Sequence, residues 1–120
     1  MIGKLRSTVI DCPDPLSLAE FYSGILGGRI APSSDENWVD VILPNDGVKV
    51  SFQRSEGYEA PRWPSNDGDQ QLHLDIAVDD MDAAHTRLLK LGARHMEDHP
   101  TFRVYLDPVG HPFCTVKVDD

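Results

Sequence analysis

An internal repeat constrains the fold more than any other feature of the sequence. Leu26–Arg29 (Leu-Gly-Gly-Arg) matches Leu91–Arg94 (Leu-Gly-Ala-Arg) at an offset of 65 residues, and the same offset relates Asp14 to Asp79. In each half the aspartate is placed to begin a helix and the glycine to end it. A period this long with only two copies indicates a duplicated module and not a solenoid. We therefore expect the 120 residues to form a single domain built from two modules.

The first module, over about residues 5–55, reads as a strand, a helix and three further strands. An apolar alternation predicts a strand over Leu5–Asp11, and Asp14 and Pro15 then provide the N-cap and first residue of a helix. Apolar residues at three- and four-residue spacing up to Leu26 give this helix one buried face. Strands are predicted over 29–32, 38–43 and 48–54, with a hairpin turn at 44–47 (Pro-Asn-Asp-Gly).

The second module, over about residues 71–118, repeats this order. It has a predicted strand over 72–78, a helix capped by Asp79 and Asp80 and ended by Gly92, and strands over 93–97, 102–107 and 113–118. A turn is expected at 108–112 (Pro-Val-Gly-His-Pro). Residues 56–70 form a linker between the modules, within which Tyr58–Pro64 is either a semi-rigid lid or an arm that packs on a partner subunit.

The charge and the hydropathy of the chain exclude several classes of partner. Asp and Glu number 20 against 11 Lys and Arg, for a net charge of −9, whereas a nucleic-acid binder needs a basic surface. The excess acid serves solubility or favours a cationic ligand. No apolar run approaches the roughly 20 residues of a membrane span. Cys12 and Cys114 lie far apart in the sequence, so we expect a reduced, cytoplasmic protein.

The ordered set of motifs resembles the vicinal oxygen chelate superfamily, and within it the glyoxalase-like and bleomycin-resistance-like domains. The resemblance runs from about Leu5 to Val118. It implies an α+β fold in which two βαβββ modules form a cup-shaped, eight-stranded mixed sheet, together with a small-molecule ligand and a homodimer. The motifs that carry it are Asp11–Pro15 (Asp-Cys-Pro-Asp-Pro), Leu18–Tyr22 (Leu-Ala-Glu-Phe-Tyr), His73–Asp75 (His-Leu-Asp), Leu91–Ala93 (Leu-Gly-Ala) and Asp107–Phe113 (Asp-Pro-Val-Gly-His-Pro-Phe).

The resemblance also implies a divalent metal at the floor of the cup, held by four strand positions. By the spacing of the family, the first is Ser7, the second is Ser51 or Gln53, the third is His73 and the fourth is Cys114. One imidazole, one thiol and an amide do not make a usual Mg, Ni or Fe site, so we expect no cofactor. The alternative is a divalent metal, namely zinc, held by His73, Cys114 and a third donor such as Asp75.

Candidate catalytic and ligand-binding residues follow from the alternation of side chains along the strands. His73 and Asp75 share one strand face, where they form either an acid–base pair or a polar pair that fixes the strand register. Cys114 is either a ligand or a small buried hydrophobe. Trp38 and Tyr105 are either pocket walls or core residues. The predicted ligand-binding residues of the cup are Ser7, Asp11, Trp38, Ser51, Gln53, Arg103, Tyr105 and Cys114, and the predicted surface histidines are His85, His95 and His99.

Three functions remain open from the sequence, because one fold hosts many chemistries. The leading hypothesis is a small-molecule-binding protein that lacks a full catalytic metal site. The second is a lyase, isomerase or dioxygenase that depends on His73, either with a metal or through acid–base chemistry with Asp75. The third is a resistance protein that sequesters a cationic drug. A true glyoxalase I activity is not expected, because it needs ligands that this chain lacks.

Overall fold

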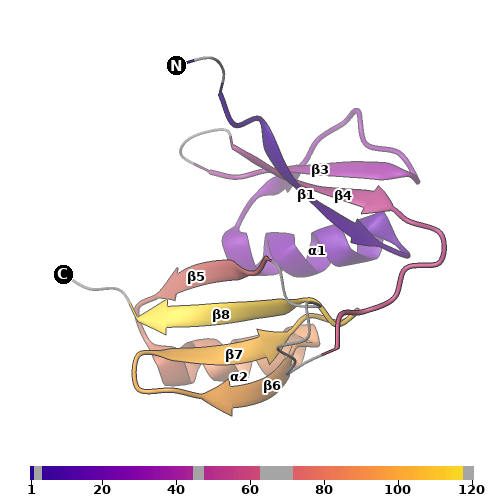
Figure 1. Ribbon diagram of the computed structural model, residues 1–120. Helices are drawn as coiled ribbons and strands as arrows, with labels where there is room; N and C mark the ends of the chain where they lie inside the picture. The colour runs from indigo at the N-terminus through magenta and orange to yellow at the C-terminus, as the bar shows by residue number, and fades with distance from the viewer. Residues whose placement is uncertain (2–3, 45–47, 63–71, 118–120) are drawn as a thin grey trace. The chain divides into compact units, whose positions relative to one another are not determined.

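Two four-stranded mixed sheets, each with one helix, make up the structure, which is a computed structural model (Figure 1). It describes residues 1, 4–44, 48–62 and 72–117. The chain divides into two compact units, an N-terminal unit of Met1–Tyr58 and a C-terminal unit of Glu59–Asp120. The strand-helix-three-strand order predicted for each half is confirmed in both.

The N-terminal unit contains β1 (Ser7–Cys12), α1 (Pro15–Leu26), β2 (Arg29–Ile30), β3 (Trp38–Ile42) and β4 (Lys49–Arg54). Its strands lie in the order β1-β4-β3-β2, with β1 parallel to β4 and the other pairs antiparallel. The Asp14 carboxylate accepts a hydrogen bond from the Ser17 N–H, and Gly27 ends α1 at φ +76°. Helix α1 therefore begins and ends where the sequence predicts.

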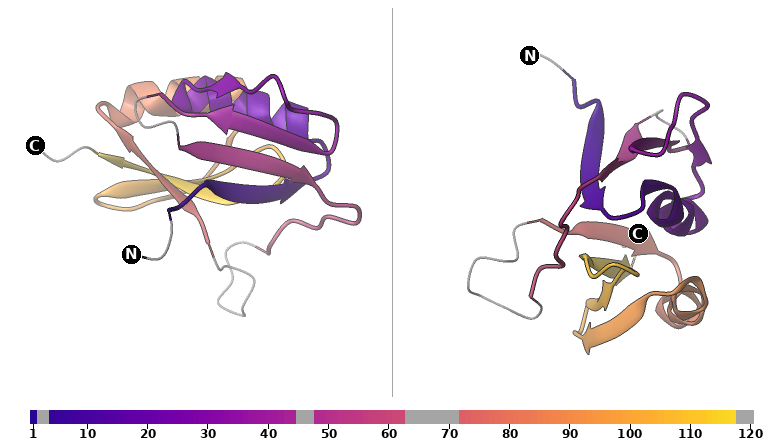
Figure 2. Two further views of the ribbon diagram at one scale, coloured as in Figure 1. Left: turned by 90° about the horizontal axis from the view of Figure 1, so that it is seen from above. Right: turned by 90° about the vertical axis from the view of Figure 1, so that its right-hand side faces the viewer.

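Helix α1 covers one face of its sheet, as Figure 2 shows, and the period-two alternation of the strands sorts their side chains accordingly. Val39, Val41 and Phe52 are buried on the helix side, where the ring of Tyr22 stacks on that of Phe52 with centroids 5.6 Å apart. The other face, here called the open face, carries the alternate residues. They are Ser7, Val9 and Asp11 of β1, Lys49, Ser51 and Gln53 of β4, and Trp38, Asp40 and Ile42 of β3.

The C-terminal unit repeats this arrangement with β5 (Leu74–Val78), α2 (Met81–Leu91), β6 (Arg94–Asp98), β7 (Phe102–Leu106) and β8 (Pro112–Lys117). The strands lie in the order β5-β8-β7-β6, and β5 is parallel to β8. The N-cap is Asp80, whose carboxylate accepts from the N–H groups of Asp82 and Ala83. Because the caps Asp14 and Asp80 are 66 residues apart and the terminal glycines only 65, α2 is one residue shorter than α1.

The predicted turn between β7 and β8 is organised by one buried carboxylate. Asp107 is fully buried, and its Oδ1 accepts hydrogen bonds from the backbone N–H groups of Val109 and His111. Its Oδ2 lies 2.6 Å from Nδ1 of His111. Gly110 adopts φ +96°, and a Cβ there would lie 2.6 Å from that of Ala60. Aspartate and glycine in the Asp-Pro-Val-Gly motif are therefore required by the turn itself.

Several predictions concern residues outside the described part of the chain. These are the hairpin turn, of which residues 45–47 are not described, and the linker, of which 63–70 are not described. The lid or arm around Trp63 belongs to the second group. Strands β1 and β5 begin at Ser7 and Leu74, two residues later than predicted in each case. Neither α1 nor α2, the helices of the described residues, is long and apolar enough to cross a membrane.

Candidate functional site

The strand registers identify which residues of the two units correspond. In the N-terminal unit Val9 pairs with Ser51, and in the C-terminal unit Asp75 pairs with Cys114. Val9 and Asp75 are 66 residues apart (75 − 9), like the N-caps Asp14 and Asp80, so both pairs join the first and last strands of a module at equivalent positions. Ser51 is therefore the counterpart of Cys114. The choice between Ser51 and Gln53 for the second of the four positions implied by the resemblance therefore falls on Ser51.

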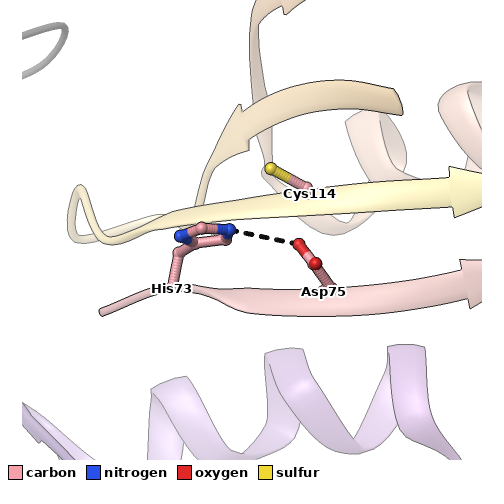
Figure 3. A group of neighbouring side chains, drawn as sticks. All are labelled: His73, Asp75 and Cys114. Atoms are coloured by element: carbon pink, nitrogen blue, oxygen red, sulfur yellow. Dashed lines mark ion pairs between the residues drawn. The ribbon is translucent and has the colours of Figure 1, made fainter. Parts of the chain in front are cut away.

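The face of the C-terminal sheet that points away from α2, here also called its open face, bears a hollow of about 440 Å³, called the C-terminal hollow. Three of the predicted site residues come together in it, as Figure 3 shows. Nε2 of His73 lies 3.2 Å from Oδ1 of Asp75. Each of the three residues, His73, Asp75 and Cys114, offers one candidate ligand atom, and these three atoms all lie within 4.8 Å of one another. The lining residues are His73, Asp75, Glu97, His99, Phe102, Val104, Pro112, Cys114 and Val116.

The Cys114 thiol lies on β8 and is only 7% exposed. Its pKa is raised to about 11, chiefly by burial, and in the same direction by the negative charge and hydrogen bond of Asp75 and by the charge of Glu97. At neutral pH the thiol is therefore protonated, and it is a weak nucleophile by itself. At this pH, a bound cation that displaces the proton would make it a thiolate.

Two lining residues, Glu97 and His99, were not among the predicted site residues. A β-bulge lies between His95 and Glu97, so that His95 pairs with Tyr105 while Glu97 pairs with Val104 and faces the hollow. Nε2 of His99 lies 3.0 Å from Oε2 of Glu97, and its ring stacks on Phe102 with centroids 4.4 Å apart. His99 is exposed as predicted, but it also lines the hollow, and no ligand spacing in the sequence indicates this.

Arg103 and Tyr105 were predicted to line the same surface as Cys114, and this placement is wrong. Val104 is the residue of β7 that pairs with Cys114, so its two neighbours point to the opposite face, toward α2. Tyr105 is fully buried there, and its hydroxyl lies 2.8 Å from Nδ1 of His85, which is half-buried and not a surface residue. Nη2 of Arg103 lies 2.7 Å from a carboxylate oxygen of Asp82 at the start of α2.

The predicted residues of the first module lie on the open face of the N-terminal unit. That face bears a second hollow, of about 370 Å³, here called the N-terminal hollow. The Ser7 and Ser51 hydroxyls lie 2.5 Å apart in it. Asp11 and Gln53 pair with each other on the same face but do not line the hollow. Its lining residues are Arg6, Ser7, Val9, Trp38, Asp40, Lys49 and Ser51.

The comparisons with known proteins agree with this architecture. The family model for a glyoxalase-like domain matches residues 7–116. No curated protein sequence matches the chain. Among solved structures, a glyoxalase/bleomycin resistance protein/dioxygenase family enzyme from Burkholderia phytofirmans PsJN has a TM-score of 0.73 at 16% identity, covering 98% of this chain and 100% of its own.

Two further neighbours carry names that specify different activities. The fosfomycin resistance protein FosX from Listeria monocytogenes has a TM-score of 0.73 at 13% identity, covering 99% of this chain and 96% of its own. The oxidase ChaP-H2 has a TM-score of 0.68 at 22% identity, with coverage of 99% and 96%. At these identities the likeness shows the fold alone. With the family model matching almost all of its length, the chain belongs to the glyoxalase-like domains of the vicinal oxygen chelate superfamily.

Proposed function

We propose that the C-terminal hollow binds a small organic molecule, with an apolar body against its wall and a polar group at His73 and Asp75. The composition of the lining carries this proposal. Phe102, Val104 and Val116 supply apolar surface, while the imidazole, carboxylate and thiol gather within 4.8 Å of one another. An apolar concavity with a few convergent polar groups is the usual form of a small-molecule site.

His73 and Asp75 would act on the polar group of the ligand. The carboxylate lies 3.2 Å from Nε2 and so orients the imidazole, and both side chains are exposed enough to contact a ligand. An imidazole held in this way can accept or donate a proton, which is the chemistry that a lyase or isomerase of this superfamily would use. Binding alone needs only the hydrogen bonds.

Ligand screening tests the proposal. We expect members of a small-molecule library to raise the thermal unfolding midpoint of the full chain, and a chelator to leave that rise unchanged. His73→Ala should abolish the rise. The matched control is His95→Ala, because His95 lies on the other face of its sheet, bonded to Asp98. A library without stabilising ligands, or ligands whose effect survives both His73→Ala and Phe102→Ala, would contradict the proposal.

A divalent metal at His73, Asp75 and Cys114 is the second candidate, favoured by the clustering of their ligand atoms. Nitrogen, oxygen and sulfur donors together suit zinc, and three protein ligands leave a coordination position open. Zinc bound there would supply Lewis-acid polarisation of an oxygen of the bound molecule. The Cys114 pKa of about 11 opposes binding, because the thiol must first lose its proton.

Cobalt substitution distinguishes this second candidate. A cobalt thiolate absorbs in the near ultraviolet, so we expect that absorption on adding Co²⁺ to the reduced chain if Cys114 is a ligand. Cys114→Ser should remove it and Cys12→Ser, the matched thiol control, should retain it. Absence of the band, together with no zinc retained in equilibrium dialysis, would leave the metal-independent site as the only proposal.

A further inference from the structure

The N-terminal hollow has a polar floor whose groups are already bonded to one another. Ser51 is fully buried and donates to Oδ1 of Asp40 at 2.5 Å. The indole N–H of Trp38 donates to the same oxygen at 2.7 Å, and Nζ of Lys49 lies 3.8 Å from Oδ2. The carboxylate of Asp40 therefore accepts two hydrogen bonds and pairs with one cation. Its charge and acceptor sites are already used within the hollow, so it is poorly placed to bind a cationic ligand.

The same bonds decide which groups of the hollow could hold a ligand. Since the Ser51 proton is directed to Asp40, the hydroxyl of Ser7 donates to Ser51 across their 2.5 Å contact. Burial by itself would raise the pKa of Asp40, but the hydrogen bonds from Ser51 and Trp38 and the nearby cations outweigh it and lower the pKa. With both serine protons engaged and Asp40 ionised, the remaining donors are the cations Arg6 and Lys49.

Arg6 and Lys49 give this hollow a positive balance within a chain of net charge −9. Within the described residues, Arg6 has no hydrogen-bond or ion-pair partner, although it lies near enough to Asp40 to help lower its pKa. A guanidinium that is unpaired matches the two oxygens of a carboxylate in a bidentate geometry. Trp38 and Val9, 36% and 43% exposed, place apolar surface beside these cations.

We propose that the N-terminal hollow binds a carboxylate carried on a small aromatic or aliphatic body. Arg6 and Lys49 would hold the carboxylate, and the body would lie against Trp38 and Val9. The indole ring is suited to this because its bond to Asp40 fixes its orientation. Where the resemblance implies metal ligands at Ser7 and Ser51, this chain thus has an organic anion site. The proposal does not rest on the function proposed for the C-terminal hollow.

Nuclear magnetic resonance of the ¹⁵N-labelled full chain provides the test, with the indole N–H signal of Trp38 as the reporter. The chain has two tryptophans, so Trp38→Phe assigns the signal. We expect benzoate to shift it saturably. Benzamide has the ring without the charge and acetate has the charge without the ring, and both should bind about tenfold more weakly or worse.

Two charge variants test the assignment of the anion to Arg6. Arg6→Gln should weaken benzoate binding about tenfold or more, since it removes a charge-assisted hydrogen bond. Arg87→Gln changes the net charge equally on the exposed surface of α2 and should leave the dissociation constant within about twofold. Arg6 is itself exposed, so its replacement should leave the backbone spectrum unchanged.

The outcomes separate this proposal from that for the C-terminal hollow. A benzoate response that persists in His73→Ala but is lost in Arg6→Gln supports the assignment of the anion to the N-terminal hollow. A response that is lost in His73→Ala and retained in Arg6→Gln overturns it. Benzamide or acetate binding as tightly as benzoate, Arg6→Gln binding as tightly as the parent chain, or no saturable shift of the Trp38 signal would each overturn the proposal as well.

Discussion

The thiol of Cys114 allows a quantitative test of the site, because its pKa of about 11 lies well above the ordinary value of 9.0. At about pH 8 a thiol of pKa 9.0 is about one tenth ionised, whereas one of pKa 11 is about one thousandth ionised. Because alkylation requires the thiolate, the native thiol should react about 100-fold more slowly than the unfolded one on this ground alone. Burial of the sulfur slows the reaction further.

The assay is alkylation by iodoacetamide in a Cys12→Ala background, with the modified peptide measured by mass spectrometry. Since burial slows the reaction at every pH, the decisive quantity is the pH at which the rate stops rising. We expect the rate for the native chain to rise up to about pH 11, and that of the urea-unfolded chain to level off near 9.0. A native profile that levels off near 9.0 would refute the electrostatic description of the site.

Asp75→Asn checks the cause of the shift. Asp75 raises the Cys114 pKa through both its charge and its hydrogen bond, so this variant should move the alkylation profile to lower pH. Asp79→Asn, at an exposed position just beyond β5, is the matched control and should leave the profile in place. An unchanged profile for Asp75→Asn would mean that Asp75 does not contribute to the raised pKa, which would then be due to burial and Glu97.

The same shift predicts the pH dependence of stability. A pKa raised from 9.0 in the unfolded chain to about 11 in the native one stabilises the fold fully below about pH 9. That contribution is lost as the pH rises through 11, to a total on the order of 2 kcal/mol. Urea unfolding of the parent and of Cys114→Ser between pH 8 and 11 should therefore show a difference in free energy that shrinks at the alkaline end.

Three further predictions concern the turn, the N-terminal hollow and the assembly state. Asp107→Ala leaves two backbone N–H groups of a buried turn without their acceptor, so urea unfolding should show that the free energy of unfolding falls by about 2–4 kcal/mol. The control Asp79→Ala should be nearly neutral, and a loss below about 1 kcal/mol for Asp107→Ala would contradict this role. Asp40→Asn should lower the free energy of unfolding by about 1 kcal/mol at neutral pH relative to the surface control Glu20→Gln. Because the pKa of Asp40 is lowered from 3.8, this difference should vanish as the pH falls through the lowered value. A difference that persists in acid would argue against a charge effect. The homodimer implied by the family resemblance predicts a sedimentation mass of twice 13.4 kDa, and a single 13.4 kDa species at all concentrations would exclude it.

The parts of the fold that the sequence predicts well are those that depend on local chemistry. Both helices end at the expected glycines and α1 begins at Asp14 as predicted, whereas α2 begins at Asp80, the second of its two predicted capping aspartates and not the Asp79 that the 65-residue offset indicates. These signals are reliable because an aspartate that accepts a backbone N–H and a glycine at positive φ act within a few residues. The faces of the N-terminal strands are likewise predicted, because Trp38 and Asp40 alternate strictly with the buried Val39 and Val41. Strand ends differ by one or two residues, where pairing with a neighbouring strand decides the boundary.

The face of β7 could not be predicted from its own residues. Phe102, Val104 and Leu106 alternate with Arg103 and Tyr105, so either set offers apolar surface for a core. Tyr105 becomes the buried residue because its hydroxyl is hydrogen-bonded to Nδ1 of His85 on α2 and its ring stacks on Phe113 of β8 with centroids 5.5 Å apart. Both partners are distant in the sequence. The residues next to Tyr105 therefore do not indicate that its hydroxyl would find a hydrogen-bond partner in the core.

The charge of the C-terminal hollow depends on one further feature that periodicity cannot reveal. Strict alternation along β6 places Glu97 on the same face as His95, where it would lie on the helix side and away from Cys114. The bulge between them turns Glu97 to the open face instead, where its negative charge adds to that of Asp75 in raising the pKa of Cys114. A single extra residue therefore gives the hollow its second carboxylate. The same carboxylate helps to keep the thiol protonated, which opposes metal binding, and it would also attract a cation, which favours it. Backbone geometry therefore bears on the choice between the metal-free site and the zinc site as well as ligand identity does.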